Sequence, residues 1–340
     1  MRSANEPVPP KFDRSDDAPA TAGRRAGTGA RIALLAGSTL ACALAVEGAW
    51  RVWWTNGFGP NTNPHYVEHD DELGWVYRRG AVARHRTADY DVTIRIDETG
   101  ERDLERGPQP PGAPIAVIGD SLAFGWGVAG AETFASRLVT LVGRPVRNLA
   151  VSGYGTDQEL LCLHRASASM RPSIGVVVVC GNDLWEILHD EMYGKGKPRF
   201  VMRSGALVIE NVPVRRSLLE RISFFYRSVH RHWSEARQVA AESIDEPRAQ
   251  SIVGRLLREM ARDLGRVGAP LVVVHEALPW VAEKTRGEPG VHVLDVAETL
   301  AVRARERPTV FAGDLHWNAT GHEAVAVAIA DELSRIESSR

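Results

Sequence analysis

The sequence predicts an α/β protein in which helices cover both faces of a mostly parallel central sheet. Short, uninterrupted apolar runs suit strands that are buried on both sides, and stretches of helical length and pattern separate them. The predicted strands are Ile115–Ile118, Val146–Val151, Gly175–Cys180, Leu271–His275 and Val291–Asp295. The predicted helices are Glu132–Val142, Asp157–Met170, Ala249–Val267 and Ala319–Ile336. The expected architecture is three layers, α/β/α.

The composition is that of an ordinary globular protein. The 340 residues are 44% hydrophobic and 25% charged, and the formal net charge of −2 gives no field that would attract nucleic acid. The three cysteines (Cys42, Cys162 and Cys180) show neither a disulfide framework nor metal-ligand spacing, so no metal and no organic cofactor is expected. Cys162 and Cys180 either pair with each other or remain buried thiols.

The N-terminus is predicted to anchor the chain in a membrane. Residues 1–31 are rich in Pro, Ala, Gly and charge, which predicts a disordered cytoplasmic tail. Residues 32–54 would span about 35 Å as a helix, enough to cross the apolar core of a bilayer. Basic residues before this segment predict that the tail stays inside (Arg24, Arg25 and Arg31). A tryptophan cluster at its end suits the opposite interface (Trp50, Trp53 and Trp54).

The same segment allows a second interpretation. Ala43-Leu44-Ala45 suits a signal peptidase, which would remove the segment after export. Glu47 and Arg51 are four residues apart and can pair, which lowers the cost of placing charges near the end of a membrane helix. In both interpretations the rest of the chain is expected outside the cytoplasm, in the periplasm or at the cell surface.

The remainder is expected to divide into an extension and a catalytic domain. Residues 55–112 form the extension, in which Tyr90–Ile96 alternates like a half-buried strand, and the turn-rich stretch at 107–114 precedes the catalytic domain at 113–340. An insertion at about 187–246 should contain a β-hairpin around Ser204-Gly205 and one helix from Ser217 to Gln238. Because it follows a central strand, the insertion is either a lid over the site or a surface subdomain.

A serine directly follows the first strand of the predicted sheet. Gly119-Asp120-Ser121-Leu122 comes after Ile115–Ile118, and ligands of parallel α/β sheets bind beyond the carboxyl ends of the strands. A serine at this position has an exposed hydroxyl and backbone donors nearby. Alone, the tetrapeptide fits a helix-capping turn equally well, since Asp and Ser are good N-caps.

Three further motifs follow later strands. Gly153 lies where a strand gives way to a helix and can bring a bare N–H close to a substrate. Asn182 follows Gly175–Cys180 and offers a side-chain amide as donor. Asp314 and His316 are two residues apart, so in an extended segment they point to the same side and the carboxylate can orient the imidazole. His316 would then take a proton from Ser121.

Some neighbouring side chains are weaker candidates. His322, in the first turn of the last predicted helix, is expected to pack or cap, and His275 ends a strand and either packs or contacts substrate. Tryptophans next to the motifs form either an aromatic wall or part of the core (Trp126, Trp185 and Trp317).

The four motifs, in this order along the chain, resemble the SGNH (GDSL-type) hydrolase superfamily. The resemblance covers about residues 115–336, and Asp71-Glu72-Leu73-Gly74-Trp75 looks like part of the N-terminal extension of its membrane-anchored bacterial members. It implies an SGNH-hydrolase-like fold, with Ser121 as nucleophile, His316 as general base and Asp314 as the carboxylate that orients it. It also implies an oxyanion hole formed by the Ser121 N–H, the Gly153 N–H and the Asn182 side chain.

One departure from the superfamily pattern keeps more than one function open. The commonest final motif has two residues between Asp and His, whereas only Leu315 stands between them here. Asp-x-His-Trp is similar to the pair in polysaccharide O-acetyltransferases of the same superfamily. We therefore expect an exported serine esterase that cleaves acyl, including acetyl, esters on a glycan or lipid. The alternatives are an O-acyltransferase that modifies an exported polysaccharide, and a membrane-tethered binding protein without turnover.

Overall fold

The structure is a computed structural model that describes residues 27–55, 66–239 and 244–339. The chain divides into two units, residues 1–46 and 47–340. Helix α1 (Thr28–Thr55) covers the predicted anchor, and among the described residues it is the one helix long and apolar enough to cross a membrane, a criterion that a signal sequence also meets. The predicted disordered tail (1–31) lies outside the described residues up to position 26. At its end the prediction is wrong, because α1 begins at Thr28, four residues before the predicted start of the anchor at residue 32.

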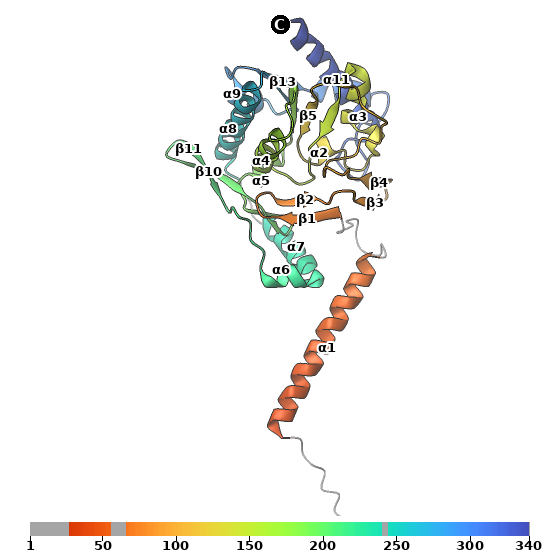
Figure 1. Ribbon diagram of the computed structural model, residues 1–340, viewed down its shortest axis with the longest axis vertical. Coiled ribbons are helices and arrows are strands. Elements are labelled where there is room, and N and C mark those ends of the chain that lie inside the picture. Colours follow the sequence, from red (N-terminus) through yellow and green to blue (C-terminus); the bar gives the residue numbers. More distant parts are fainter. Residues whose placement is uncertain (1–26, 56–65, 240–243, 340) are drawn as a thin grey trace, which may run out of the picture. The chain divides into compact units, whose positions relative to one another are not determined.

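The predicted parallel sheet is confirmed. Five strands lie in the order β13-β12-β7-β5-β6, and each neighbouring pair is parallel. Figure 1 labels β5 and β13 of this sheet. Their bounds are β5 (Ile115–Ile118), β6 (Val146–Asn148), β7 (Ile174–Val179), β12 (Leu271–His275) and β13 (Val291–Asp295). Since β5 lies between β6 and β7, the loops that follow these three strands meet at one edge.

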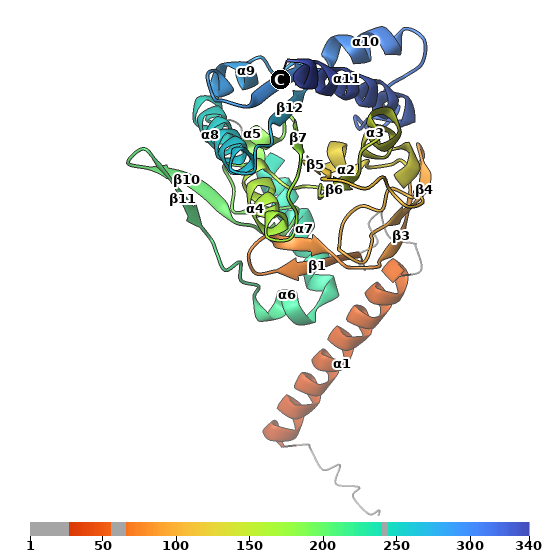
Figure 2. The ribbon, with the colours of Figure 1, turned by 45° about the horizontal axis from the view of Figure 1, so that its top comes forward.

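Helices cover both faces of this sheet, which gives the three predicted layers. Val176 and Val178 of β7 pack in the core on one face, and Val177 and Val179 pack in the core on the other. The first face is covered by α3 (Phe134–Val142) and α11 (Ala319–Ser338), with α10 (Ala297–Ala304) beside α11. The second is covered by α4 (Thr156–Ser167) and α8 (Glu246–Gly265), with α9 (Trp280–Thr285) beside α8 (Figure 2).

Capping residues move several predicted helix boundaries. The helix expected from Glu132 begins at Phe134, because the Thr133 side chain accepts a hydrogen bond from the Ser136 N–H and Gly130–Glu132 forms a separate 3₁₀ turn. The helix expected from Ala249 begins at Glu246, because Asp245 caps it and a proline occupies its first turn.

Three further elements also have bounds that differ from the predictions. The strand expected to reach Val151 ends at Asn148, and the helix expected to reach Met170 ends at Ser167. The central strand expected from Gly175 to Cys180 runs one residue earlier at both ends.

Between β7 and α8 the chain forms small elements outside the main sheet. After α5 (Asp183–Glu186) come two hairpins, β8 (Glu191–Met192) with β9 (Lys195–Gly196) and β10 (Arg199–Arg203) with β11 (Ala206–Glu210). The single helix predicted over 217–238 is wrong: α6 (Leu218–Ile222) and α7 (Phe224–Val239) are separated at Ser223, which adopts an extended conformation. Ser217 caps α6 and the Ser223 hydroxyl accepts from the Tyr226 N–H, so each helix has its own serine at the start.

Before β5, two antiparallel hairpins pack onto the core of the main sheet. They comprise β1 (Val67–Asp70) with β2 (Gly74–Tyr77) and β3 (Val82–Arg86) with β4 (Asp91–Arg95), and β4 lies within the predicted strand Tyr90–Ile96. Trp75 and Tyr77 are buried in the same core as the sheet. The Ser152 N–H donates to the Tyr77 hydroxyl at 2.9 Å, and the Tyr154 hydroxyl donates to the Trp75 carbonyl at 2.5 Å. Both bonds fix the turn that carries Gly153.

Candidate active site

Ser121 lies where the central strand β5 meets a short helix. Gly119 adopts a φ of +148°, and a side chain there would meet Ala123, so the chain turns sharply into α2 (Ser121–Phe124). Asp120 caps this helix by accepting the Leu122 N–H at 2.9 Å. The turn holds Ser121 as the first residue of α2, partly exposed at the carboxyl edge of the sheet.

His316 joins Ser121 to Asp314. Its Nε2 lies 2.7 Å from the Ser121 Oγ, and its Nδ1 contacts Asp314 Oδ1, which also accepts the His316 backbone N–H at 3.0 Å. The Phe311 N–H donates to the His316 carbonyl at 3.1 Å, so the loop bends back on itself. One residue between Asp and His is therefore enough for contact. That residue, Leu315, points away from the pair and is 89% exposed.

The two backbone donors expected near Ser121 are available. Gly153 has a φ of +78° and is partly exposed in its turn. Among the described residues, neither the Ser121 N–H nor the Gly153 N–H donates to another group of the protein. Backbone N–H groups without a partner at this edge of the sheet can donate hydrogen bonds to a negatively charged oxygen.

The Asn182 amide, which was expected to be a free donor, already has hydrogen-bond partners. Its Nδ2 donates to Asp120 Oδ2 and to Glu186 Oε1, both at 3.1 Å. An amide nitrogen has two hydrogens, so both are directed at carboxyl groups in this structure. Asn182 is thereby tied to the residue before Ser121.

A group of buried carboxyls, which no sequence motif predicted, lies behind Asn182. Burial, together with the charges of Asp183 and Asp120, raises the pKa of Glu186 to about 8, and burial with Asp120 raises the pKa of Asp183 to about 7. The Tyr193 hydroxyl donates to Glu186 Oε1 at 2.6 Å. Glu186 is four residues after Asn182 in a helical turn, a spacing that could have revealed it, whereas Tyr193 has no local sequence signal.

Tyr193 and Lys197, in the segment after β7, contact residues of the site and of α4. A Cβ on Gly153 would lie 2.7 Å from the Tyr193 ring, so this ring covers the glycine and explains why no larger residue fits there. Lys197 is fully buried and donates to Asp157 at 2.5 Å and to the Glu186 carbonyl at 3.2 Å. A buried ion pair of this kind is costly to break from one side, so it fixes the segment against α4.

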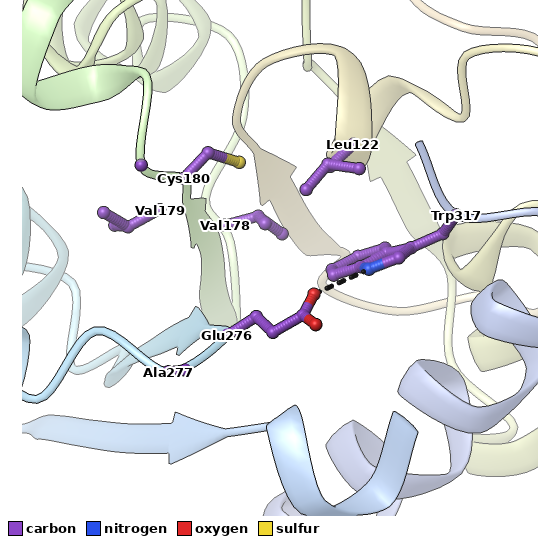
Figure 3. Close-up of a pocket in the computed structure, with 8 residues that line it drawn as sticks. Leu122, Val178, Val179, Cys180, Glu276, Ala277 and Trp317 are labelled. Carbon is purple, nitrogen blue, oxygen red and sulfur yellow. Dashed lines mark hydrogen bonds between the residues drawn. The ribbon is translucent and has the colours of Figure 1, made fainter. Parts of the chain in front are cut away.

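The three tryptophans have different surroundings. The Trp126 ring lies 6.1 Å from the His316 ring and 4.5 Å from the buried His85, so it is the one beside the Ser121–His316 pair. Trp317 is buried and donates to Glu276 at 3.2 Å (Figure 3). Trp185 packs edge-on against His189.

The two weaker histidine candidates are packing residues. His322 is buried, its Nδ1 accepts the Phe134 N–H at 3.3 Å, and burial lowers its pKa to about 3, so it stays neutral. His275 is also buried and accepts the Leu278 N–H at 3.1 Å. These contacts favour a packing role for both histidines, which is the alternative to substrate contact that the sequence allowed.

A pocket of about 270 Å³ opens at the carboxyl ends of β7 and β12 (Figure 3). Its lining includes the immediate chain neighbours of Ser121, Asn182 and His316, namely Leu122, Gly181 and Trp317. Val178 and Cys180 add apolar wall, and Glu276 adds one carboxylate. Cys162 and Cys180 are both free thiols. Within the described ranges, no group of three His, Cys, Asp or Glu side chains is arranged to hold a metal ion.

A model of the GDSL-like lipase/acylhydrolase family matches residues 117–324, more than half of the chain. The chain belongs to this family. The predicted membership of the SGNH superfamily is thus confirmed, and with it an enzyme class that hydrolyses esters. A search of curated protein sequences finds no match.

Several solved structures are similar to this GDSL-like chain at low identity. A lipolytic protein of the G-D-S-L family from Veillonella parvula is 13% identical over 66% of this chain and 100% of its own, with a TM-score of 0.40. A lipase/acylhydrolase from Enterococcus faecalis is 14% identical over 65% of this chain and 95% of its own, with a TM-score of 0.40. A catalytic mutant of Axe2, an acetylxylan esterase from Geobacillus stearothermophilus, is 14% identical over 66% and 94%, with a TM-score of 0.37.

Proposed function

We propose that this chain is a serine esterase that cleaves acyl esters of a glycan or lipid outside the cytoplasm. The observation that supports it most is the 2.7 Å distance between the Ser121 Oγ and the His316 Nε2, with Asp314 on the opposite ring nitrogen. Nucleophile, base and orienting carboxylate within hydrogen-bond reach are what acyl transfer through a serine requires.

The reaction proceeds in two steps. His316 takes the Ser121 hydroxyl proton through Nε2 as the oxygen attacks the ester carbonyl, and Asp314 stabilises the resulting imidazolium through Nδ1. Collapse of the tetrahedral intermediate breaks the carbon–oxygen bond to the alcohol, which leaves with the proton from His316. Water then attacks the acyl-serine in the same way and releases the acid.

Three donors stabilise the negatively charged oxygen in this proposal. The Ser121 and Gly153 N–H groups are available at the strand edge, and the Asn182 amide is the third. For Asn182 to contribute, one of its N–H groups must leave Glu186. The raised pKa of Glu186, about 8, supports this step, because a neutral carboxyl group holds an amide N–H less strongly than a carboxylate does. Each donor should be worth about 10²- to 10³-fold in rate.

The pocket supports an apolar acyl group. At about 270 Å³, with walls from Leu122, Val178 and Trp317, it has room for an apolar acyl group, acetyl or longer, next to the chain neighbours of Ser121 and His316. The N-terminal helix α1 supports a location at a membrane, with the catalytic part on the outer side as the basic tail indicates.

Transfer to an acceptor hydroxyl is the second candidate. The Asp314-Leu315-His316-Trp317 spacing favours it, and Trp317 is held in place by Glu276. In this alternative reaction, a sugar hydroxyl replaces water in the second step. Incubation of the enzyme with an acetyl donor and a polysaccharide separates the two: free acid alone supports the esterase, and acylated polysaccharide supports transfer.

The nucleophile is tested with a fluorophosphonate, which labels activated serines. The full chain should gain one phosphonyl group on Ser121, and Ser121→Ala should gain none and lose about 10⁴-fold or more of its activity on a soluble acetyl ester. A folded chain that is inert to the probe and to esters would instead support a binding protein. Labelling of another serine at full rate in Ser121→Ala would contradict the assignment.

A further inference from the structure

Helix α6 exposes an apolar face that no other part of the described chain covers. Leu218, Leu219 and Ile222 are 67%, 51% and 58% exposed, and α6 has no buried residue. Leu218 and Leu219 lie four and three positions before Ile222, so both share a side of the helix with it. Phe225 and Val229, four apart on α7, are exposed as well. In Figures 1 and 2, α6 lies beyond β1, on the side of the catalytic unit away from α11.

The start of α7 is joined to the end of helix α1. Glu47 accepts the Phe224 N–H at 2.7 Å, the Phe225 N–H at 3.0 Å and the Ser223 hydroxyl at 2.9 Å. A carboxylate at this position satisfies the free N–H groups of a helix N-terminus and complements its dipole. Glu47 therefore acts as a cap for α7 from a distant part of the sequence.

Two more residues of α1 strengthen this junction. Arg51 bonds to Glu47 at 2.6 Å and to the Ile222 carbonyl at 3.2 Å, and the Trp50 indole donates to the Ser228 hydroxyl at 3.0 Å. Glu47, Trp50 and Arg51 all belong to the part of α1 that is apolar enough to cross a membrane. The apolar face of α6 is thus held next to the last turns of that segment.

The charges around α6 suit a lipid surface. Arg215, Arg216 and Arg221 are exposed beside the apolar face, while the one acidic residue of α6, Glu220, is engaged in capping through the Ser217 N–H. Exposed leucine and isoleucine on one side with arginine nearby is the pattern of helices that lie in the interface of a bilayer with anionic lipids.

We propose that α6 and the start of α7 form a second membrane contact, in which Leu218, Leu219 and Ile222 enter the interface of the leaflet where α1 ends. This proposal rests on the anchoring by α1. With this second contact, the catalytic unit is held against the membrane at two points, which fixes the orientation of the unit.

Quenching by lipids tests the contact in the full chain. In a Cys42→Ser background, Leu219→Cys is labelled with an environment-sensitive fluorophore and reconstituted into vesicles of phosphatidylcholine and phosphatidylglycerol that contain a nitroxide lipid. Cys180 is buried, and burial raises the pKa of Cys162 to about 12, so both react slowly. The matched control is Val302→Cys on α10, which is 50% exposed against 51% for Leu219. Leu40→Cys on α1 reports the anchor itself.

The proposal expects strong quenching at positions 219 and 40, and none at 302. Quenching at 40 without quenching at 219 overturns the second contact and leaves the anchor intact. A label at 219 that is protected from aqueous iodide but not quenched by lipid also overturns it, because a protein surface then covers α6. No quenching at either position overturns both the contact and the anchor. Activity on a soluble ester shows that each variant is folded.

Discussion

In the proposed mechanism, the contact between Asp314 and His316 determines whether the imidazole is ready to accept a proton. Asp314 Oδ1 binds both the ring Nδ1 and the backbone N–H of His316, so it fixes the ring and its tautomer. Asp314→Asn should keep the geometry and favour the wrong tautomer. We expect kcat on a soluble acetyl ester to fall roughly 10³- to 10⁴-fold with little change in KM. A loss of less than tenfold would mean that another group orients His316.

Glu186 should link stability to pH. Its pKa is about 8 in the folded chain against an ordinary value of 4.5, so between these values the folded state holds a proton that the unfolded state has released. The stability that this proton contributes is complete below pH 4.5 and is lost as the pH rises towards 8, at up to roughly 1.4 kcal/mol per pH unit.

Glu186→Gln removes this dependence and still accepts from Tyr193 and Asn182 through its amide oxygen. We expect the variant to gain stability relative to the unaltered chain as the pH rises from 5 to 8. Urea unfolding of the detergent-solubilised proteins at several pH values measures the difference. A difference that stays constant, or falls with pH, would contradict a neutral Glu186.

At the scale of single residues, sequence and structure agree where function depends on local position. Ser121, Gly153 and His316 follow strand ends or precede a helix, and such positions can be read from the pattern of apolar runs. Tyr193 and Glu186 could not be identified in this way. Their partners are fixed by the path of the chain after β7. This path places Tyr193, which has no local sequence signal, over Gly153.

At the scale of elements, the β3–β4 hairpin supports the loop that carries the histidine. The Asp89 carboxylate accepts the Gly313 N–H at 3.1 Å, and the Tyr90 ring packs 5.0 Å from the Phe311 ring. Asp89→Ala should let this loop move and lower kcat about tenfold, the equivalent of one hydrogen bond to a charged group. Asp91→Ala is the control, because Asp91 pairs with Arg84 on the exposed side of the same hairpin. Equal losses in both variants would show a general effect of the hairpin instead.

Where helices begin and end was the least predictable feature of the elements. The residues from 217 to 238 have an apolar repeat that continues past Ser223, so periodicity alone predicts one helix. The chain breaks there because the Ser223 hydroxyl accepts the Tyr226 N–H and donates to Glu47, a residue 176 positions away. Central strands were predicted well, since their composition follows from burial on both faces.

At the scale of the whole molecule, the orientation across a membrane is open to direct measurement. Val302 is exposed on α10, so a cysteine there in a Cys42→Ser background should react with a membrane-impermeant maleimide in intact cells if the catalytic unit is exported. We expect labelling without lysis and a mature chain that retains α1, as shown by intact mass. Labelling only after lysis would place the catalytic unit inside, and loss of the first 45 or so residues would identify α1 as a signal sequence.

The exposed position of Leu315 separates substrate preference from acid–base chemistry, two properties that enzymes often cannot change independently. Its neighbours on both sides, Asp314 and His316, contact each other, and His316 contacts Ser121, whereas the Leu315 side chain is exposed to the solution. In the proposed mechanism, substitutions at this position can therefore change the exposed surface beside the alcohol part of the substrate and leave the acid–base pair unaltered. A saturation library at this codon would be a compact route to new substrate preferences on an unchanged catalytic frame.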